Sequence, residues 1–192
     1  MAQATRGRPR GFDRETVLER AMLAFWEHGY EATSIAELTA AMGITPPSLY
    51  SAFGDKKGLF RAAVRHYQET VGGEPLRAVA ADADAREWIR GLLLGVARAY
   101  TEPSRPRGCL VISAATNCTA DSADIEAELR ALREVNVAEL TRRLSAGGVA
   151  GAAGFARYLA AVVQGMSQQA RDGATREDLE LIAQAALRAW PA

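Results

Sequence analysis

The sequence contains little of what builds several large classes of protein. Among 192 residues there are two cysteines and two histidines, and aromatic residues make up 7%. Two cysteines are too few for a disulfide scaffold. The most apolar stretch, residues 149–163, is interrupted by Arg157 and falls short of the roughly 20 residues that a membrane span requires. No basic and apolar leader opens the chain, so we expect a cytoplasmic protein without a membrane partner.

Net charge is also absent, because 23 basic residues balance 23 acidic ones. This balance disfavours a uniformly basic nucleic-acid coat and an acidic disordered tail. The charges are nevertheless uneven. Four arginines against one aspartate give residues 1–14 a charge of +3, and two lysines and two arginines against one aspartate give residues 54–66 the same charge. Two short basic islands therefore bracket an acidic segment, which predicts contact with a polyanion at defined places.

The pattern of apolar residues predicts an all-α fold. Alanine is abundant, apolar residues recur three and four positions apart, and strand-like alternation is missing. The character of the chain changes after Gly72, Gly73 and Pro75. We therefore divide it into four parts: a basic N-terminal arm (1–11), a three-helix unit (12–55), a connecting helix (56–72) and a larger helical domain (73–192).

Local start and stop signals define the first helices. Asp13 can cap a helix that ends near His28, and Ser34 has capping-box spacing to Glu37 at the start of a second helix. Gly43 can adopt the left-handed conformation that ends this second helix near Met42.

A third helix is expected after Thr45, which can cap it, with Pro46 at the first helical position, where a missing N–H costs nothing. Longer helices are expected farther along the chain: to about residue 70, from Trp88 to before Pro103, and over about 121–144, 151–172 and 175–190.

Residues 34–53 have the form of a helix-turn-helix, in which two short helices are joined by a turn that contains glycine. The second helix of such a unit enters the major groove of DNA, so residues 45–53 are the candidate readers. The alternative interpretation is a helical hairpin that only packs.

Both flanks of this unit are basic. The arm contains Arg6, Arg8 and Arg10 among glycine and proline residues, and such arginines can reach into a narrow minor groove. Lys56 and Lys57 lie at the start of the next helix, where backbone N–H groups already favour a phosphate. Each cluster alone could be a solvated charge patch, but their position around a helix-turn-helix favours DNA binding.

Residues 7–60 resemble the DNA-binding domain of the TetR family of bacterial transcriptional regulators. The resemblance lies in the spacing of a few positions: His28-Gly29-Tyr30, Thr33, Leu49-Tyr50, Phe53, Lys56 and Leu59. It implies a homodimer with an N-terminal helix-turn-helix domain and a larger helical domain for ligand binding and dimerisation. In this family a small ligand usually releases the DNA. A departure is Thr39, where a smaller alanine is commoner, and this is expected to loosen the helix packing slightly.

The resemblance also implies roles for individual residues. Thr45, Tyr50 and Lys56 would contact phosphates. Pro46, Pro47 and Ser48 would face the bases, and Ser34 is a further candidate DNA contact.

Between Pro46 and Ala52 there is no arginine, lysine, asparagine or glutamine, so the usual bidentate base contacts are unavailable from this helix. We therefore expect specificity to depend on the arginine arm and on DNA shape.

The larger domain contains the candidate effector site. Aromatic and polar residues there suit an uncharged or weakly polar ligand in an apolar pocket, although core or interface packing is the alternative. The candidates are Trp88, Tyr100, Cys109, Asn117, Gln164 and Gln168. The sequence does not name the ligand.

Cys109 also allows an alternative way of regulating the protein, in which its thiol senses electrophiles or oxidants. Arg105 and Arg107 are close in sequence and would favour the thiolate form. On one regular helix Cys109 and Cys118 would lie on opposite faces, which argues against a disulfide within the helix.

The last two helices are rich in glycine and alanine, which permit close helix approach, and the family uses these helices as its dimer interface. A dimer would place two recognition helices about 34 to 36 Å apart, as successive major grooves require.

Other classes of function fit less well. Both histidines, His28 and His66, lie in or beside the candidate DNA-binding region, and there is no glycine-rich phosphate loop or metal-ligand cluster. We therefore expect neither an enzyme nor a bound cofactor. A helical ligand carrier that keeps a degenerate helix-turn-helix stays open, as does activation in place of repression.

Overall fold

The computed structural model describes residues 13–80 and 83–191, which are helical and contain no strand. The N-terminal helices are α1 (Arg14–His28), α2 (Ile35–Met42), α3 (Pro46–Phe53) and α4 (Lys56–Glu69), followed by a 3₁₀ turn (Val71–Gly73) and α5 (Glu74–Arg77). The remaining elements are α6 (Ala85–Tyr100), α7 (Leu110–Ser113), a second 3₁₀ turn (Ala120–Ser122), α8 (Ala123–Ala146), α9 (Ala152–Arg171) and α10 (Arg176–Arg188).

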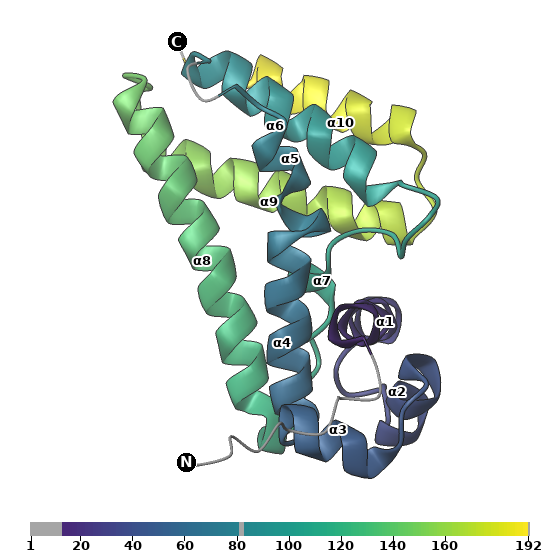
Figure 1. The fold of residues 1–192 in the computed structure, drawn as a ribbon. Coiled ribbons are helices and arrows are strands. Elements are labelled where there is room, and N and C mark those ends of the chain that lie inside the picture. Colours follow the sequence, from purple (N-terminus) through teal and green to yellow (C-terminus); the bar gives the residue numbers. More distant parts are fainter. Residues whose placement is uncertain (1–12, 81–82, 192) are drawn as a thin grey trace, which may run out of the picture.

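Figure 1 shows that α1, α2 and α3 form one end of the molecule, while α6, α9 and α10 pack together at the other end. Helix α4 rises from α3 towards α5 and joins the two ends. Helix α8 extends along most of the molecule, and the short α7 lies between α4 and α1.

The predicted caps of the first two helices are confirmed. The Asp13 carboxylate accepts from the Glu15 amide at 3.2 Å. Ser34 and Glu37 form a complete capping box, with bonds of 3.1 and 2.7 Å. Gly43 has φ 68°, in the left-handed region, and ends α2.

The third helix begins at Pro46 as predicted, but Thr45 does not cap it with its side chain. Pro46 and Pro47 have no N–H to donate, which removes two of the first donors of the helix. The Thr45 hydroxyl instead lies 3.0 Å from the hydroxyl of Ser48.

The buried side chains form two clusters. The first includes the inner faces of α1–α4, and Phe25, Tyr30 and Phe60 pack edge-to-face or stacked within it. Side chains from α7, the residues just after it and the start of α8 complete this cluster: Leu110, Val111, Ala114, Ala115, Ile125 and Leu129. The second cluster unites α6, α9, α10 and the rest of α8. Part of the C-terminal region thus packs into the core of the helix-turn-helix unit.

Candidate nucleic-acid interface and cavity

Helices α2 and α3 are held by three fully buried side chains, Leu38, Met42 and Leu49. Leu49 is the one buried residue of α3, so most of this helix is available on its outer side. The predicted contact residues lie there: Thr45, Pro46, Pro47 and Tyr50 are exposed, and Ser48 is half-buried. The described part of the chain therefore presents α3 as a protruding helix with hydroxyl and proline groups at its start. Ser34 is also exposed, with its hydroxyl engaged in the α2 cap.

Lys56 and Lys57 have different surroundings. The Lys56 ammonium lies 4.4 Å from the centroid of the Tyr30 ring and donates to the carbonyl of Glu31 at 3.3 Å. Partial burial lowers the pKa of Lys56. Lys57 instead forms an ion pair with Asp124 of α8 at 2.6 Å and donates to the Asp121 carbonyl.

Arg61 extends the contact between α4 and α8, because its guanidinium pairs with Asp124 at 2.9 Å and with Glu128 at 2.6 Å. In this structure Lys57 and Arg61 therefore join α4 to α8. Arg6, Arg8 and Arg10 of the arm lie outside the described residues.

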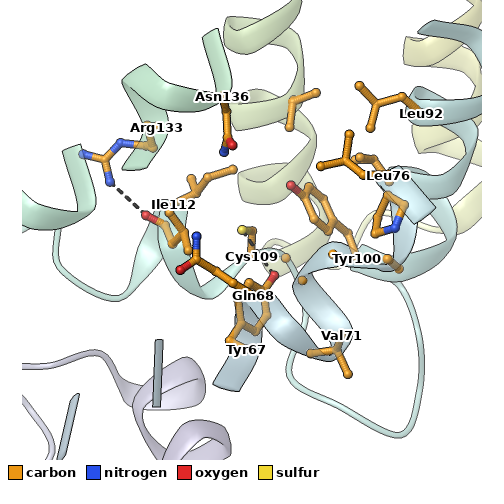
Figure 2. A pocket seen from close by; sticks show the side chains of 18 of the residues that line it. Tyr67, Gln68, Val71, Leu76, Leu92, Tyr100, Cys109, Ile112, Arg133 and Asn136 are labelled. Atoms are coloured by element: carbon orange, nitrogen blue, oxygen red, sulfur yellow. Dashed lines mark hydrogen bonds between the residues drawn. The ribbon is translucent and has the colours of Figure 1, made fainter. Parts of the chain in front are cut away.

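A cavity of about 250 Å³ lies between the two buried clusters. Its wall is mainly apolar and is formed by residues of α1 and α4–α9. Figure 2 shows Tyr100 of α6, Cys109 at the start of α7, Ile112 of α7 and Asn136 of α8 converging on this space. Four of the six predicted ligand residues line it: Trp88, Tyr100, Cys109 and Gln164.

Asn117 and Gln168, which were also predicted to bind the ligand, do not line this cavity. Helix α7 ends at Ser113, and Asn117 lies on an exposed loop after it. Gln168 lies on the exposed side of α9, where its amide donates to Asp172 at 2.8 Å.

Several lining residues escaped the sequence analysis. Tyr67 and Gln68 belong to α4, which was assigned only a connecting role, and Arg133 and Asn136 are polar residues of α8. Tyr67 could have been predicted to face inward, because it continues the apolar stripe of α4 at helical spacing.

Cys109 is held at the N-terminal end of α7. Its backbone N–H donates to the buried hydroxyl of Ser167 at 3.0 Å, and the Tyr67 hydroxyl donates to its sulfur at 3.3 Å. Burial raises the pKa of Tyr67 and of Tyr100 well above the ordinary value, so both phenols stay protonated at neutral pH.

The two arginines expected to favour a thiolate at Cys109 are bonded elsewhere. Arg105 pairs with Glu74 at 2.9 Å, and Arg107 donates to carbonyls of Ala170 and Ala174. Cys118 lies away from the cavity, and burial raises the pKa of its thiol.

Two contacts join the cavity region to α1. The Tyr30 amide, just past the end of α1, donates to the carbonyl of Ala114 at 2.6 Å, immediately after α7. Arg171 of α9 donates to the carbonyls of Trp26 and Glu27, each at 3.3 Å. Arginine at the C-terminal end of a helix also interacts favourably with the helix dipole. A displacement of α7 or α9 at the cavity would therefore pull on these hydrogen bonds and shift the end of α1.

The helix-turn-helix region matches a known sequence family. The model of bacterial regulatory proteins of the tetR family matches residues 17–63. The transcriptional repressor ComR of Escherichia coli K12 is 35% identical over 97% of this chain and 93% of its own length. The chain belongs to the TetR family.

Other TetR-type relatives support this assignment. The repressor BdcR of the same bacterium is 30% identical over 90% of this chain and 86% of its own length. The regulator CifR, solved in a cysteine-substituted form with 26-base-pair operator DNA, is 41% identical. It superposes with a TM-score of 0.91 over 96% of this chain and all of its own.

Members of the TetR family are DNA-binding transcriptional regulators and not enzymes, and this protein is such a regulator. Within the described ranges, no three acidic, histidine or cysteine side chains are grouped as a metal site. None of the helices described is both long enough and apolar enough to span a membrane.

Proposed function

We propose that this TetR-family protein is a homodimeric, cytoplasmic repressor that binds a palindromic operator and is released by a small molecule in the cavity. The observation that carries the proposal is the position of the cavity between the two buried clusters. Val111 belongs to the helix-turn-helix core and also lines the cavity, three residues before the Ala114 carbonyl that bonds to Tyr30. A ligand that shifts α7 would thus reorient α1 and the helices packed on it.

On DNA, we assign phosphate contacts to Thr45, Tyr50 and Lys56, base contacts to Pro46, Pro47 and Ser48, and a supporting contact to Ser34. Because α3 carries no side chain for a bidentate base contact, Arg6, Arg8 and Arg10 would supply much of the specificity from the minor groove.

For the dimer, we assign the interface to α9 and α10. Helix α9 has an exposed face of small residues and one aromatic residue at helical spacing: Gly154, Tyr158, Ala161 and Gly165. On α10, Leu181 is 62% exposed and adds apolar surface that a partner helix could cover. Sedimentation of the purified chain tests this assignment: wild type is expected to be dimeric, and Gly165→Arg or Leu181→Glu to shift it towards monomer. A monomeric wild type would contradict the interface.

Selection of bound genomic fragments followed by fluorescence anisotropy tests operator binding. We expect tight, salt-sensitive binding to a palindrome, and deletion of residues 1–10 is expected to reduce the ratio of operator to random-DNA affinity. If both affinities fall equally, the arm only anchors the protein. Absence of DNA binding even at low salt would contradict the repressor and favour the ligand carrier.

One observation favours a second candidate function, the sensing of electrophiles: Cys109 lies in the cavity wall. Its thiolate would add to the C=C bond of a Michael acceptor: the C–S bond forms as the C=C π bond breaks, and the carbon beside the carbonyl, which receives the electron pair, takes a proton from solvent in place of the one that the thiol lost. N-ethylmaleimide is then expected to weaken operator binding of wild type and of Cys118→Ser, but not of Cys109→Ser. Equal responses of all three proteins would exclude thiol sensing at Cys109.

A further inference from the structure

Tyr100 brings a buried hydroxyl to the cavity. The residue ends α6 and is 6% exposed. Figure 2 shows its ring among the side chains that enclose the cavity, with the hydroxyl directed into the space that Cys109 and Asn136 also face. Within residues 13–80 and 83–191, the polar atom beside this hydroxyl is the Cys109 sulfur. A sulfur is a weak acceptor, and this one already receives the proton of the Tyr67 hydroxyl at 3.3 Å.

A molecule in the cavity can reach the Tyr100 hydroxyl. In the described part of the chain, the one side-chain nitrogen or oxygen that is fully enclosed and unpaired is the indole nitrogen of Trp26. The Tyr100 oxygen is not enclosed in this way, and its residue lines the cavity. Burial raises the pKa of Tyr100 well above its ordinary value, so the hydroxyl keeps its proton at neutral pH. Because buried polar groups are normally hydrogen-bonded, this hydroxyl is a donor that an entering molecule can satisfy.

The wall also limits the charge of the ligand. Three charged side chains of the lining are already bonded within the protein: Arg105 to Glu74, Arg133 to the Val111 carbonyl at 2.8 Å, and Glu139 to Arg142 and Arg143. Figure 2 shows the Arg133 guanidinium turned away from Tyr100. The rest of the lining is mainly apolar. An uncharged ligand would leave these bonds intact and would lose little hydration on entering.

We propose that the effector is an uncharged, mainly apolar molecule whose carbonyl-type oxygen accepts a hydrogen bond from the Tyr100 hydroxyl. The inference rests on the proposed effector cavity and adds to it the chemical class of the ligand and the residue that recognises it. The rest of the molecule lies against apolar side chains of the wall, among them Leu92, Ile112 and Leu140.

Tyr100 also connects such a ligand to α7. Its backbone carbonyl accepts a hydrogen bond from the Gly108 amide at 3.0 Å, and the next residue, Cys109, is the N-terminal cap position of α7. Helix α7 leads in turn to the Ala114 carbonyl that bonds to the Tyr30 amide. A ligand held by Tyr100 therefore acts on the connection between α6 and α7, at the start of the route to α1.

Two probes of nearly equal shape separate the hydrogen bond from apolar filling. Acetophenone carries a carbonyl oxygen, and α-methylstyrene has a CH₂ group in its place. Calorimetric titration of the full-length protein is expected to show that Tyr100→Phe, which loses only the hydroxyl, binds acetophenone about fivefold more weakly than wild type does. The affinity for α-methylstyrene is expected to be the same in both proteins. Because each probe is compared between proteins, the difference in hydration of the two probes cancels.

Tyr67→Phe is the matched control, because it makes the same change at the other buried tyrosine of the wall, whose hydroxyl is bonded to the Cys109 sulfur. It is expected to change the affinities for both probes by the same factor. A second readout is the ¹³C signal of carbonyl-labelled acetophenone bound to wild type. It is expected to lie downfield of its position in cyclohexane, which has no hydrogen-bond donor, and to lose most of this shift in Tyr100→Phe but not in Tyr67→Phe.

Three results would overturn the inference. If Tyr100→Phe binds acetophenone as wild type does, or weakens both probes by the same factor, the hydroxyl does not recognise the ligand, while the cavity remains the effector site. A bound carbonyl signal at its cyclohexane position in wild type leads to the same conclusion. If neither probe shows saturable binding to wild type, the cavity assignment fails and the inference with it. Operator binding without ligand is measured separately, so none of these results bears on the DNA-binding function.

Discussion

Replacing Gly29 by alanine tests the connection between the cavity and the DNA-binding helices. Gly29 has φ 82° and ψ 167°, a backbone conformation that residues with a Cβ rarely adopt, and forcing alanine into it costs about 1–3 kcal/mol. The new Cβ would also stand 3.3 Å from the carbonyl oxygen of Ala114, which must then give way. That carbonyl accepts the 2.6 Å bond from the Tyr30 amide, so weakening it adds about 1 kcal/mol. The free energy of unfolding is therefore expected to fall by about 2–4 kcal/mol.

Gly54→Ala is the control that isolates the contact. Gly54 has φ 84° and ψ −64°, also unfavourable for alanine, but a Cβ there would meet nothing within 4 Å. Urea denaturation followed by circular dichroism is expected to show Gly29→Ala less stable than Gly54→Ala by about 1 kcal/mol. The factor by which effector weakens operator binding is expected to fall in Gly29→Ala and to stay unchanged in Gly54→Ala. Equal stabilities together with equal effector factors would refute the coupling through Ala114.

Three further predictions concern the DNA-binding unit. Leu49→Ala removes the one buried side chain of α3 and is expected to reduce stability by about 3–5 kcal/mol in urea denaturation; a loss below 1 kcal/mol would mean that α3 is not held by this contact. Ser34→Ala removes the α2 cap and is expected to lower the free energy of unfolding by about 1 kcal/mol, whereas Ser34→Asp, which can still cap, is expected to be nearly neutral. The hydrogen bond from Lys57 lowers the pKa of Asp124, so the stability that Asp124 contributes is present above about pH 4 and is lost as the pH falls through its folded-state value. The stability difference between wild type and Asp124→Asn is therefore expected to shrink below pH 4, and a difference independent of pH would contradict the pairing.

The helix-turn-helix could be predicted because its signals are local. The caps at Asp13 and Ser34, the stop at Gly43 and the start at Pro46 each depend on residues within four positions, and the three helices begin or end where these signals place them. Thr45 is the instructive failure. Its type and position suited a cap, but its hydroxyl lies 3.0 Å from the hydroxyl of Ser48, and the Ser48 amide donates to the Thr45 carbonyl instead.

The rest of the site depends on contacts between residues far apart in the sequence. Lys57 and Arg61 lie in a basic island that suggested a phosphate site, yet their partners on α8 are 63 to 67 residues away. The cavity has the same character, because it is enclosed by helices from both halves of the chain. Periodicity shows that Tyr67 and Leu140 face inward, but it does not show that they line the same space. Asn117 was chosen for its polarity, and it lies on an exposed loop outside the cavity.

The contacts that orient the DNA-binding helices on the remainder of the protein are individually weak. The ion pairs of Lys57 and Arg61 with α8 are partly exposed, and such pairs contribute about 0–1 kcal/mol each. The bonds of Arg171 and Ala114 to the end of α1 are each of the order of 1 kcal/mol. A ligand bound with micromolar affinity releases about 8 kcal/mol. To move a two-state equilibrium from 1:99 to 99:1, the ligand must bind the favoured state about 5.5 kcal/mol more tightly than the other state. The ligand can therefore change how α1–α3 sit on the molecule without unfolding them, because their own core, with Phe25, Leu49 and Phe60 fully buried, is far more costly to disrupt.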